Sequence, residues 1–127
     1  MTFYYFVGRK KDVIKRGGEN VSAAQVEAAL ASHPDVAEVA VVGVPDPIRQ
    51  EEIKAYVLLR PGKQLDATTP IDLWSHCATR LAPFAVPRYL AFPRSLPRTG
   101  SGKVQKEALK AGPPCGENEY DRSAFLT

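Results

Sequence analysis

The stretch "VAEVAVVGVPDPIRQEEIKAYVLL" (residues 36–59) determines the fold of this chain. Its first part, residues 36–44, is rich in valine, and in residues 53–59 the side chains of Ile53, Ala55, Val57 and Leu59 alternate with those of Lys54, Tyr56 and Leu58. These patterns are typical of β-strands, because successive strand side chains point to opposite faces of a sheet. The connecting segment "PDPIRQEE" (45–52) therefore predicts two strands that pair with each other.

The segment "DVIKRGGENV" (12–21) predicts a hairpin in front of these strands. Gly17 and Gly18 accept backbone angles that other residues avoid, and extended residues flank them. A glycine pair also leaves the backbone bare, so that a ligand could lie directly against it. A simple glycine-rich turn without a ligand is the alternative interpretation. Residues 3–7, "FYYFV", predict a further strand near the start of the chain.

Two helices are expected to pack against the sheet. Ser22 and Gln25 have the spacing of a capping box, and Pro34 ends the helix that follows. A second helix is predicted over residues 70–82, because it begins at a proline and has one apolar face. That face is predicted to consist of Ile71, Trp74, Cys77, Ala78 and Leu81. Residues 88–92 predict another strand, and the fold class is α+β, with a small mixed or antiparallel sheet flanked by helices and an N-terminal hairpin.

Length and composition are those of one soluble domain. The chain has 127 residues, of which 44% are hydrophobic and 24% charged. None of its apolar runs approaches the roughly 20 residues that span a bilayer. We expect one domain over residues 1–110, which ends in a short helix or turn, and a flexible tail over 111–127, because the tail is rich in glycine and proline and lacks periodicity.

The cysteines and charges narrow the classes of function. Two cysteines, Cys77 and Cys115, imply no disulfide framework, so a reduced, cytoplasmic setting is expected. His33 and His76 lie far from any Cys-x-x-Cys pattern, and we expect no metal site. The formal net charge is +3, and basic residues concentrate in "RKKDVIKR" (9–16). This segment is either a solvated face or an anion-binding patch.

The segment "RTGSGKVQK" (98–106) resembles a phosphate-binding loop at first sight. A P-loop would need a glycine where the chain has Pro97 and a serine or threonine where it has Val104, so both requirements fail. What remains is Lys103 on a flexible Gly/Ser loop. A lysine on a long stem can reach an anion that develops during a reaction. An exposed loop with an incidental lysine is the alternative.

Four segments, taken in order, resemble one family. They are "GRKKDVIKRGGENVSAAQVE" (8–27), "HPDVAEVAVVGVPDPIRQEEIKAYV" (33–57), "LAPFAVPRYLAF" (81–92) and "LPRTGSGKVQK" (96–106). Together they are similar to the C-terminal domain of the adenylate-forming superfamily, which comprises acyl-CoA synthetases, luciferase-like enzymes and peptide-synthetase adenylation domains. The residue sequence of these segments is most similar to that of crotonobetaine/carnitine-CoA ligases and fatty-acid-CoA ligases. The resemblance covers about residues 3–110.

The resemblance implies a ligase reaction in two steps. ATP, with Mg²⁺, activates a carboxylic acid as acyl-AMP, and CoA then displaces AMP to form a thioester. It also implies an N-terminal adenylation domain as partner, which holds the nucleotide and the acid. The isolated chain is therefore expected to be inactive, to bind no cofactor tightly by itself, and to have no nucleic-acid partner.

The resemblance further assigns roles to individual residues. Lys103 corresponds to the catalytic lysine of adenylation, Lys11 to the hinge between the domains, and Arg9 to an arginine near the nucleotide ribose. The residues implied to face CoA and its pantetheine arm are Gly17, Gly18, Glu19, Arg49 and Arg88. Two alternatives remain at this point: a peptide-synthetase-type domain that acts on a carrier protein, and a stand-alone nucleotide-binding module without catalysis.

Overall fold

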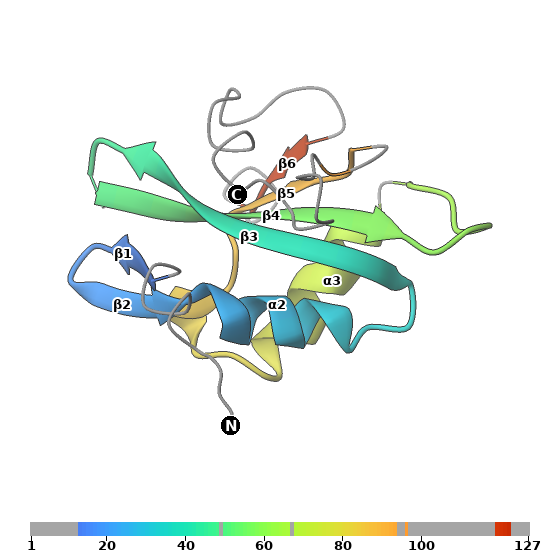
Figure 1. The fold of residues 1–127 in the computed structure, drawn as a ribbon, viewed down its shortest axis with the longest axis horizontal. Coiled ribbons are helices and arrows are strands. Elements are labelled where there is room, and N and C mark those ends of the chain that lie inside the picture. Colours follow the sequence, from blue (N-terminus) through green and yellow to red (C-terminus); the bar gives the residue numbers. More distant parts are fainter. Residues whose placement is uncertain (1–12, 49, 67, 94–95, 97–118, 123–127) are drawn as a thin grey trace, which may run out of the picture.

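The computed structural model describes residues 13–48, 50–66, 68–93, 96 and 119–122, and it shows an α+β fold (Figure 1). The predicted fold class is confirmed. The elements are, in chain order, β1 (Val13–Arg16), β2 (Glu19–Ser22), α2 (Ala23–Ala31), β3 (Val36–Asp46), β4 (Gln50–Leu59), α3 (Thr68–Ala78), the 3₁₀-helix η1 (Pro83–Ala85), β5 (Tyr89–Ala91) and β6 (Glu119–Asp121).

Strand β4 is the centre of the sheet. It pairs with β3 in antiparallel orientation, from Asp46 opposite Gln50 to Val36 opposite Leu59. It also pairs with β5 in parallel orientation, and β6 pairs antiparallel with β5, so the sheet is mixed. The predicted strands are confirmed, but they extend further into the connecting segment than the sequence indicated, because Asp46 and Gln50 already belong to the ladder.

Both faces of β4 are buried. Ile53, Ala55 and Val57 contribute to the core that α2 and α3 cover, and these two helices lie beneath the sheet in Figure 1. On the opposite face, Tyr56 packs with valines of β3 and with Leu96. Alternation along the strand predicted this division into two faces, although it did not show that the second face is also covered.

Lys54 lies on that second face and is 0% exposed. Its Nζ donates a hydrogen bond to Glu119 Oε1 over 2.7 Å, and it lies 4.8 Å from the ring centroid of Tyr56. A lysine is rarely buried unless its charge is paired, and Glu119 of β6 provides that pairing.

Helix α2 begins where the sequence predicts. Ser22 is the N-cap, and its Oγ accepts a hydrogen bond from the Gln25 backbone N–H over 3.3 Å. The helix ends at Ala31, so His33 follows the last turn, although its side chain is still buried.

The predicted apolar face of the second helix is wrong in part. Helix α3 begins at Thr68, and Ile71 is 47% exposed while Leu73 is 1% exposed. Ala78 is exposed as well. The orientation of α3 follows from Trp74, whose indole N–H donates to the Pro87 carbonyl oxygen over 2.9 Å while the ring is buried. This contact turns Leu73 and Cys77 toward the core.

Three residues of the segment predicted as a tail pair with the sheet. Residues 119–121, which belong to the segment expected to be flexible, form β6 against β5. The strand predicted over 3–7 and the short helix or turn predicted over 103–111 lie outside the described residues. No helix among the described residues is long and apolar enough to cross a membrane.

Candidate functional site

The glycine turn between β1 and β2 is a tight hairpin. β1 and β2 pair from Val13 opposite Ser22 to Arg16 opposite Glu19, and φ is 59° at Gly17 and 86° at Gly18. Two successive positive φ angles are the geometry of a type I′ turn, which matches the twist of paired strands. A Cβ added to Gly18 would meet nothing within 4 Å, so the backbone at the turn is open to a ligand.

Acidic side chains of β4 hold this hairpin. Arg16 Nε donates to Glu52 Oε1 over 2.7 Å, and Arg16 Nη2 donates to Glu52 Oε2 over 3.4 Å. The backbone N–H of Lys15 donates to Glu51 Oε1 over 2.9 Å. The Glu51 carboxylate fits in this place because Gly43 has no side chain: a Cβ there would lie 2.9 Å from Glu51 Cδ.

Arg88 joins the same charged cluster at the start of β5. Its Nε and Nη2 donate to the two carboxylate oxygens of Asp121 over 3.0 and 3.2 Å. Its Nη1 lies 3.6 Å from Asp46 Oδ1 and 3.8 Å from Glu52 Oε2. The hydrogen bond with Asp121 is the main cause that raises the pKa of Arg88 above its ordinary value. Glu52 thus lies between Arg88 and the hairpin arginine, Arg16.

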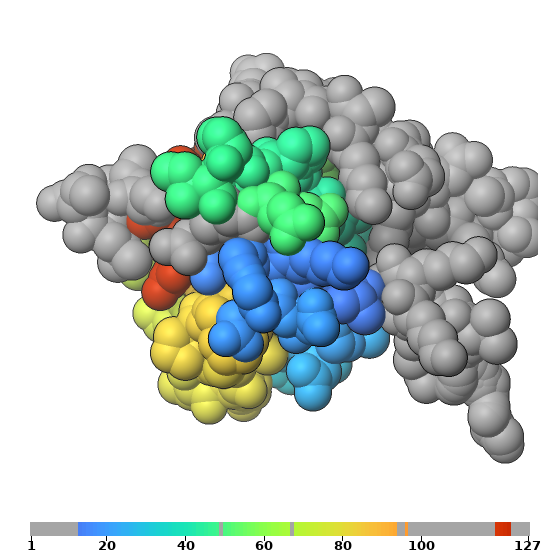
Figure 2. Space-filling view, turned by 90° about the vertical axis from the view of Figure 1, so that its left-hand side faces the viewer, coloured from blue at the N-terminus to red at the C-terminus, as the bar shows by residue number. Residues whose placement is uncertain are grey.

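The structure therefore brings part of the predicted site together. Gly17, Gly18 and Glu19 form the hairpin tip, and Arg88 is connected to it through Glu52 and Arg16. In Figure 2 the hairpin, in blue, lies directly below the green turn between β3 and β4 on one face of the molecule. The other predicted site residues, Arg9, Lys11, Arg49 and Lys103, lie outside the described residues, and their roles stay predictions.

Sequence reasoning missed the acidic residues of this site. The sequence pattern places Glu51 and Glu52 in a connecting segment and Asp121 in the predicted tail. One signal was available: a pair of carboxylates directly before a buried strand, opposite a basic hairpin. No local pattern pointed to Asp121, which lies 33 positions from Arg88.

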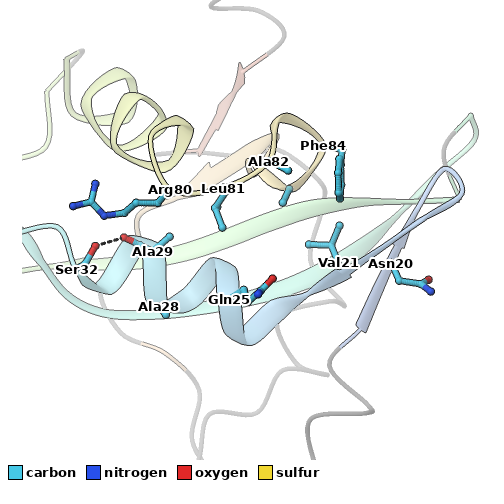
Figure 3. A pocket seen from close by; sticks show the side chains of 11 residues that line it. Asn20, Val21, Gln25, Ala28, Ala29, Ser32, Arg80, Leu81, Ala82 and Phe84 are labelled. Atoms are coloured by element: carbon cyan, nitrogen blue, oxygen red, sulfur yellow. Dashed lines mark hydrogen bonds between the residues drawn. The ribbon is translucent and has the colours of Figure 1, made fainter.

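A groove of about 530 Å³ adjoins the hairpin (Figure 3). Asn20 and Val21 of β2 line one end of it, and α2 lines one side. Leu81 and Phe84 line the other side, near η1. Most of this lining is apolar, and Arg80 adds a charge at the opposite end from Asn20.

His33, Asp35 and Asp72 form a group whose candidate ligand atoms lie within 4.8 Å of one another. Nδ1 of His33 accepts a hydrogen bond from the Asp35 backbone N–H over 3.0 Å, so in the neutral ring Nε2 carries the proton that faces Asp72 Oδ2, also over 3.0 Å. Both ring nitrogens are thereby engaged. The arrangement is that of a contact between α2 and α3, and it leaves no lone pair of the ring directed at a cation.

His76 lies beside this group at the α2–α3 contact. Its ring centroid is 4.9 Å from that of His33, and Nε2 lies 2.8 Å from Ser32 Oγ. Because Ser32 Oγ donates to the Ala29 carbonyl oxygen, it accepts from His76. Burial is the main cause that lowers the pKa of His76, with smaller contributions from Arg80 and His33. Burial thus favours the neutral form of His76.

Comparison with known proteins identifies the family. Residues 25–103 match the family model of the AMP-binding enzyme C-terminal domain. The chain belongs to this family, and the resemblance found in the sequence is confirmed.

Individual relatives agree with this assignment. The chain is 45% identical over 108 residues to a crotonobetaine/carnitine–CoA ligase of Salmonella arizonae and 47% identical to one of Proteus mirabilis. Each match covers 85% of this chain and 20% of the relative, so the chain spans about a fifth of the length of these ligases.

Solved structures show the same fold. An acyl-CoA synthetase of Brucella canis superposes with a TM-score of 0.76 at 44% identity, over 83% of this chain and 19% of that one. An anthranilate CoA ligase in complex with anthranoyl-AMP superposes with a TM-score of 0.75 at 35% identity, over 80% of this chain and 20% of that one.

Proposed function

We propose that this chain serves as the C-terminal lid domain of an AMP-forming acyl-CoA ligase. The observation that carries the proposal is the open type I′ turn at Gly17 and Gly18, which Glu51 and Glu52 hold beside Arg88. Membership of the family supplies the reaction class. We infer a cytoplasmic setting and an N-terminal adenylation domain as the partner.

The proposed reaction has two steps. A carboxylate oxygen attacks the α-phosphorus of ATP, and the bond to pyrophosphate breaks. The thiol of CoA then attacks the acyl carbonyl, the bond to AMP breaks, and the thiol proton is released. Lys103 is proposed to stabilise the negative charge that develops on the carboxylate and the α-phosphate in the first step.

The domain is proposed to work with two different faces. Rotation about Lys11, near Arg9, withdraws Lys103 and presents the hairpin to the pantetheine arm of CoA. A hinge needs only a few residues whose backbone angles change, and such gating lets one site run two reactions. The residues that suit CoA are the bare backbone at Gly17 and Gly18 and the cationic side chains of Arg49 and Arg88.

Arg88 adds a condition to this proposal. Its guanidinium already forms a two-point contact with Asp121. A phosphate of CoA would have to replace that carboxylate, or share the guanidinium through Nη1, which faces Asp46 and Glu52 at longer distances. The Asp121→Asn variant is therefore expected to bind CoA more tightly than the parent chain does.

Two experiments test the proposed function. The isolated chain should release no pyrophosphate from ATP with any of a range of carboxylic acids, and robust turnover would contradict the proposal. In the second, the chain replaces the matching 108-residue region of the Proteus mirabilis ligase. Lys103→Ala should then abolish adenylation and leave thioester formation from supplied acyl-AMP intact.

The matched control for that variant is Lys63→Ala. Lys63 pairs with Asp35 over 3.4 Å in the loop after β4, away from the hairpin. It should leave both half-reactions unchanged. Equal loss of the two half-reactions in Lys103→Ala would argue against the proposed role. Transfer of the acyl group to a carrier protein in preference to CoA would indicate the peptide-synthetase type instead.

A further inference from the structure

We propose that Glu52 is a positioning residue, a buried carboxylate that fixes the direction of the hairpin tip relative to Arg88. The inference rests on the proposed function of the hairpin, and it extends it by naming the residue that aims the turn. Glu52 does not contact the reacting atoms in this proposal. It acts through Arg16, which directly precedes Gly17 in the chain.

Glu52 is an acidic side chain in a buried position. Glu52 is 2% exposed, and its two carboxylate oxygens face Arg16 and Arg88. Arg16 approaches with two nitrogen atoms, over 2.7 and 3.4 Å. Charge-assisted, two-point contacts between a guanidinium and a carboxylate are stronger and more directional than neutral hydrogen bonds. Such a contact restrains the orientation of Arg16 as well as its distance.

Little backbone pairing connects the hairpin to strand β4. Within the described residues, the register between β1 and β4 consists of one pair, Arg16 opposite Gln50. Gln50 itself has a φ of 73°, an unusual conformation for a residue other than glycine. The middle of the hairpin is held by Ile14 and Val21, whose side chains lie in the core. The direction of the tip therefore depends on side chains.

Glu52 differs from its neighbour Glu51 in burial and in the groups that it contacts. Glu51 is less buried than Glu52 and accepts one backbone N–H, that of Lys15. Glu52 contacts both the hairpin arginine and Arg88, so its negative charge couples the two cations. A change that removes this charge and preserves the shape should loosen the tip and leave the core intact.

The structural test uses the 127-residue chain itself and compares Glu52→Gln with Glu38→Gln. Glu38 lies exposed on β3, opposite Leu58 and far along the strand from the hairpin. Amide hydrogen exchange at residues 13–22 should accelerate in Glu52→Gln and stay unchanged in Glu38→Gln. The amides of α2 should keep their protection in both. Unchanged exchange in the hairpin would overturn the positioning role.

Because Glu52→Gln leaves two arginines beside a neutral group, it could fail to fold. Arg16→Gln then gives the same test from the partly exposed side of the pair. Arg16→Lys keeps the charge and loses the two-point geometry, so its hairpin exchange should lie between that of the parent chain and that of Arg16→Gln. Identical exchange in all three would overturn the proposal.

The functional test uses the chimera with the Proteus mirabilis ligase. A displacement of the tip by about 1 Å should slow a reaction that depends on its alignment by about 10- to 100-fold. We expect Glu52→Gln to lower the rate of thioester formation by this factor and to raise KM for CoA, while adenylation stays unchanged. Equal loss of both half-reactions would overturn the positioning role. Faster hairpin exchange with normal thioester formation would instead contradict the proposed function of the hairpin.

Discussion

Replacing Gly18 with alanine separates backbone strain from function. Gly18 has a φ of 86°, and Gly62, in the loop after β4, has a φ of 89°. A Cβ at either position would meet nothing within 4 Å. Both substitutions therefore introduce the same left-handed strain without a clash. The strain costs about 1–2 kcal/mol, and the smaller entropy of the unfolded alanine chain offsets about 0.4–1 kcal/mol of it.

The expected net loss of stability is about 1 kcal/mol for each variant, from the difference of these two effects. For a chain of this length that corresponds to a fall in Tm of about 4 °C. Thermal unfolding followed by circular dichroism measures it. In the chimera, Gly18→Ala should lower the rate of thioester formation, since the new methyl group projects from the bare backbone, while Gly62→Ala should leave it unchanged.

Three results would refute this reasoning. Equal effects of Gly18→Ala and Gly62→Ala on thioester formation would show that stability alone controls the rate. A normal rate in Gly18→Ala would show that no ligand lies against the turn. A much larger loss of stability at one position than at the other would contradict the equal strain inferred from their φ angles.

Three further predictions concern the core and the α2–α3 contact. Leu73→Ala should lower the free energy of unfolding by about 2–5 kcal/mol, whereas Ile71→Ala, on the exposed side of α3, should change it by less than about 0.5 kcal/mol. Urea titration of the two variants compares these losses. A larger loss in Ile71→Ala than in Leu73→Ala would support the apolar face predicted from the sequence. Cys77 is fully buried and its pKa is raised to about 11, mainly by burial, so it should resist alkylation at pH 8 until the chain unfolds, and rapid labelling of the native chain would contradict this. His76 has a pKa below its ordinary value of 6.5, so its contribution to stability is present above pH 6.5 and is lost as the pH falls below that value. The urea midpoint should therefore fall less between pH 7 and pH 5 in His76→Gln than in the parent chain. An equal fall in both would contradict the prediction.

Local patterns in the sequence predicted the elements whose causes are local. The glycine pair fixes the hairpin turn because it permits two positive φ angles in succession, and Ser22 fixes the start of α2 because its hydroxyl oxygen caps the helix. The alternation over residues 53–59 fixes which side chains of β4 share a face. In each case the residues that decide the structure lie within a few positions of one another.

Contacts between distant segments could not be predicted in this way. Lys54 and Glu119 lie 65 positions apart, and Arg16 and Glu52 lie 36 apart. Whether such charges meet depends on how the strands are ordered in the sheet, and periodicity does not contain that information. The exposed position of Ile71 has the same origin, because the rotation of α3 is set by the contact of Trp74 with Pro87.

The resemblance to a family supplied candidate site residues that composition and periodicity alone do not. It placed Gly17, Gly18 and Arg88 in one site, and the structure connects the hairpin to Arg88 through Glu52. It offered no role for Glu52, although Glu52 lies within one of the segments that carry the likeness, and none for Asp121, which lies outside them. The network that holds the proposed site therefore became visible only in three dimensions.

Strand β6 has a practical consequence for any shortened form of this protein. The family match ends at residue 103, so a fragment cut at that boundary would lack residues 119–121. The backbone of β5 would then present an open sheet edge, and such edges promote pairing between separate molecules. Lys54 would also lose the carboxylate of Glu119 while remaining in the interior of the sheet. Light scattering should detect self-association of that fragment, because strand β6 no longer covers this edge of the sheet.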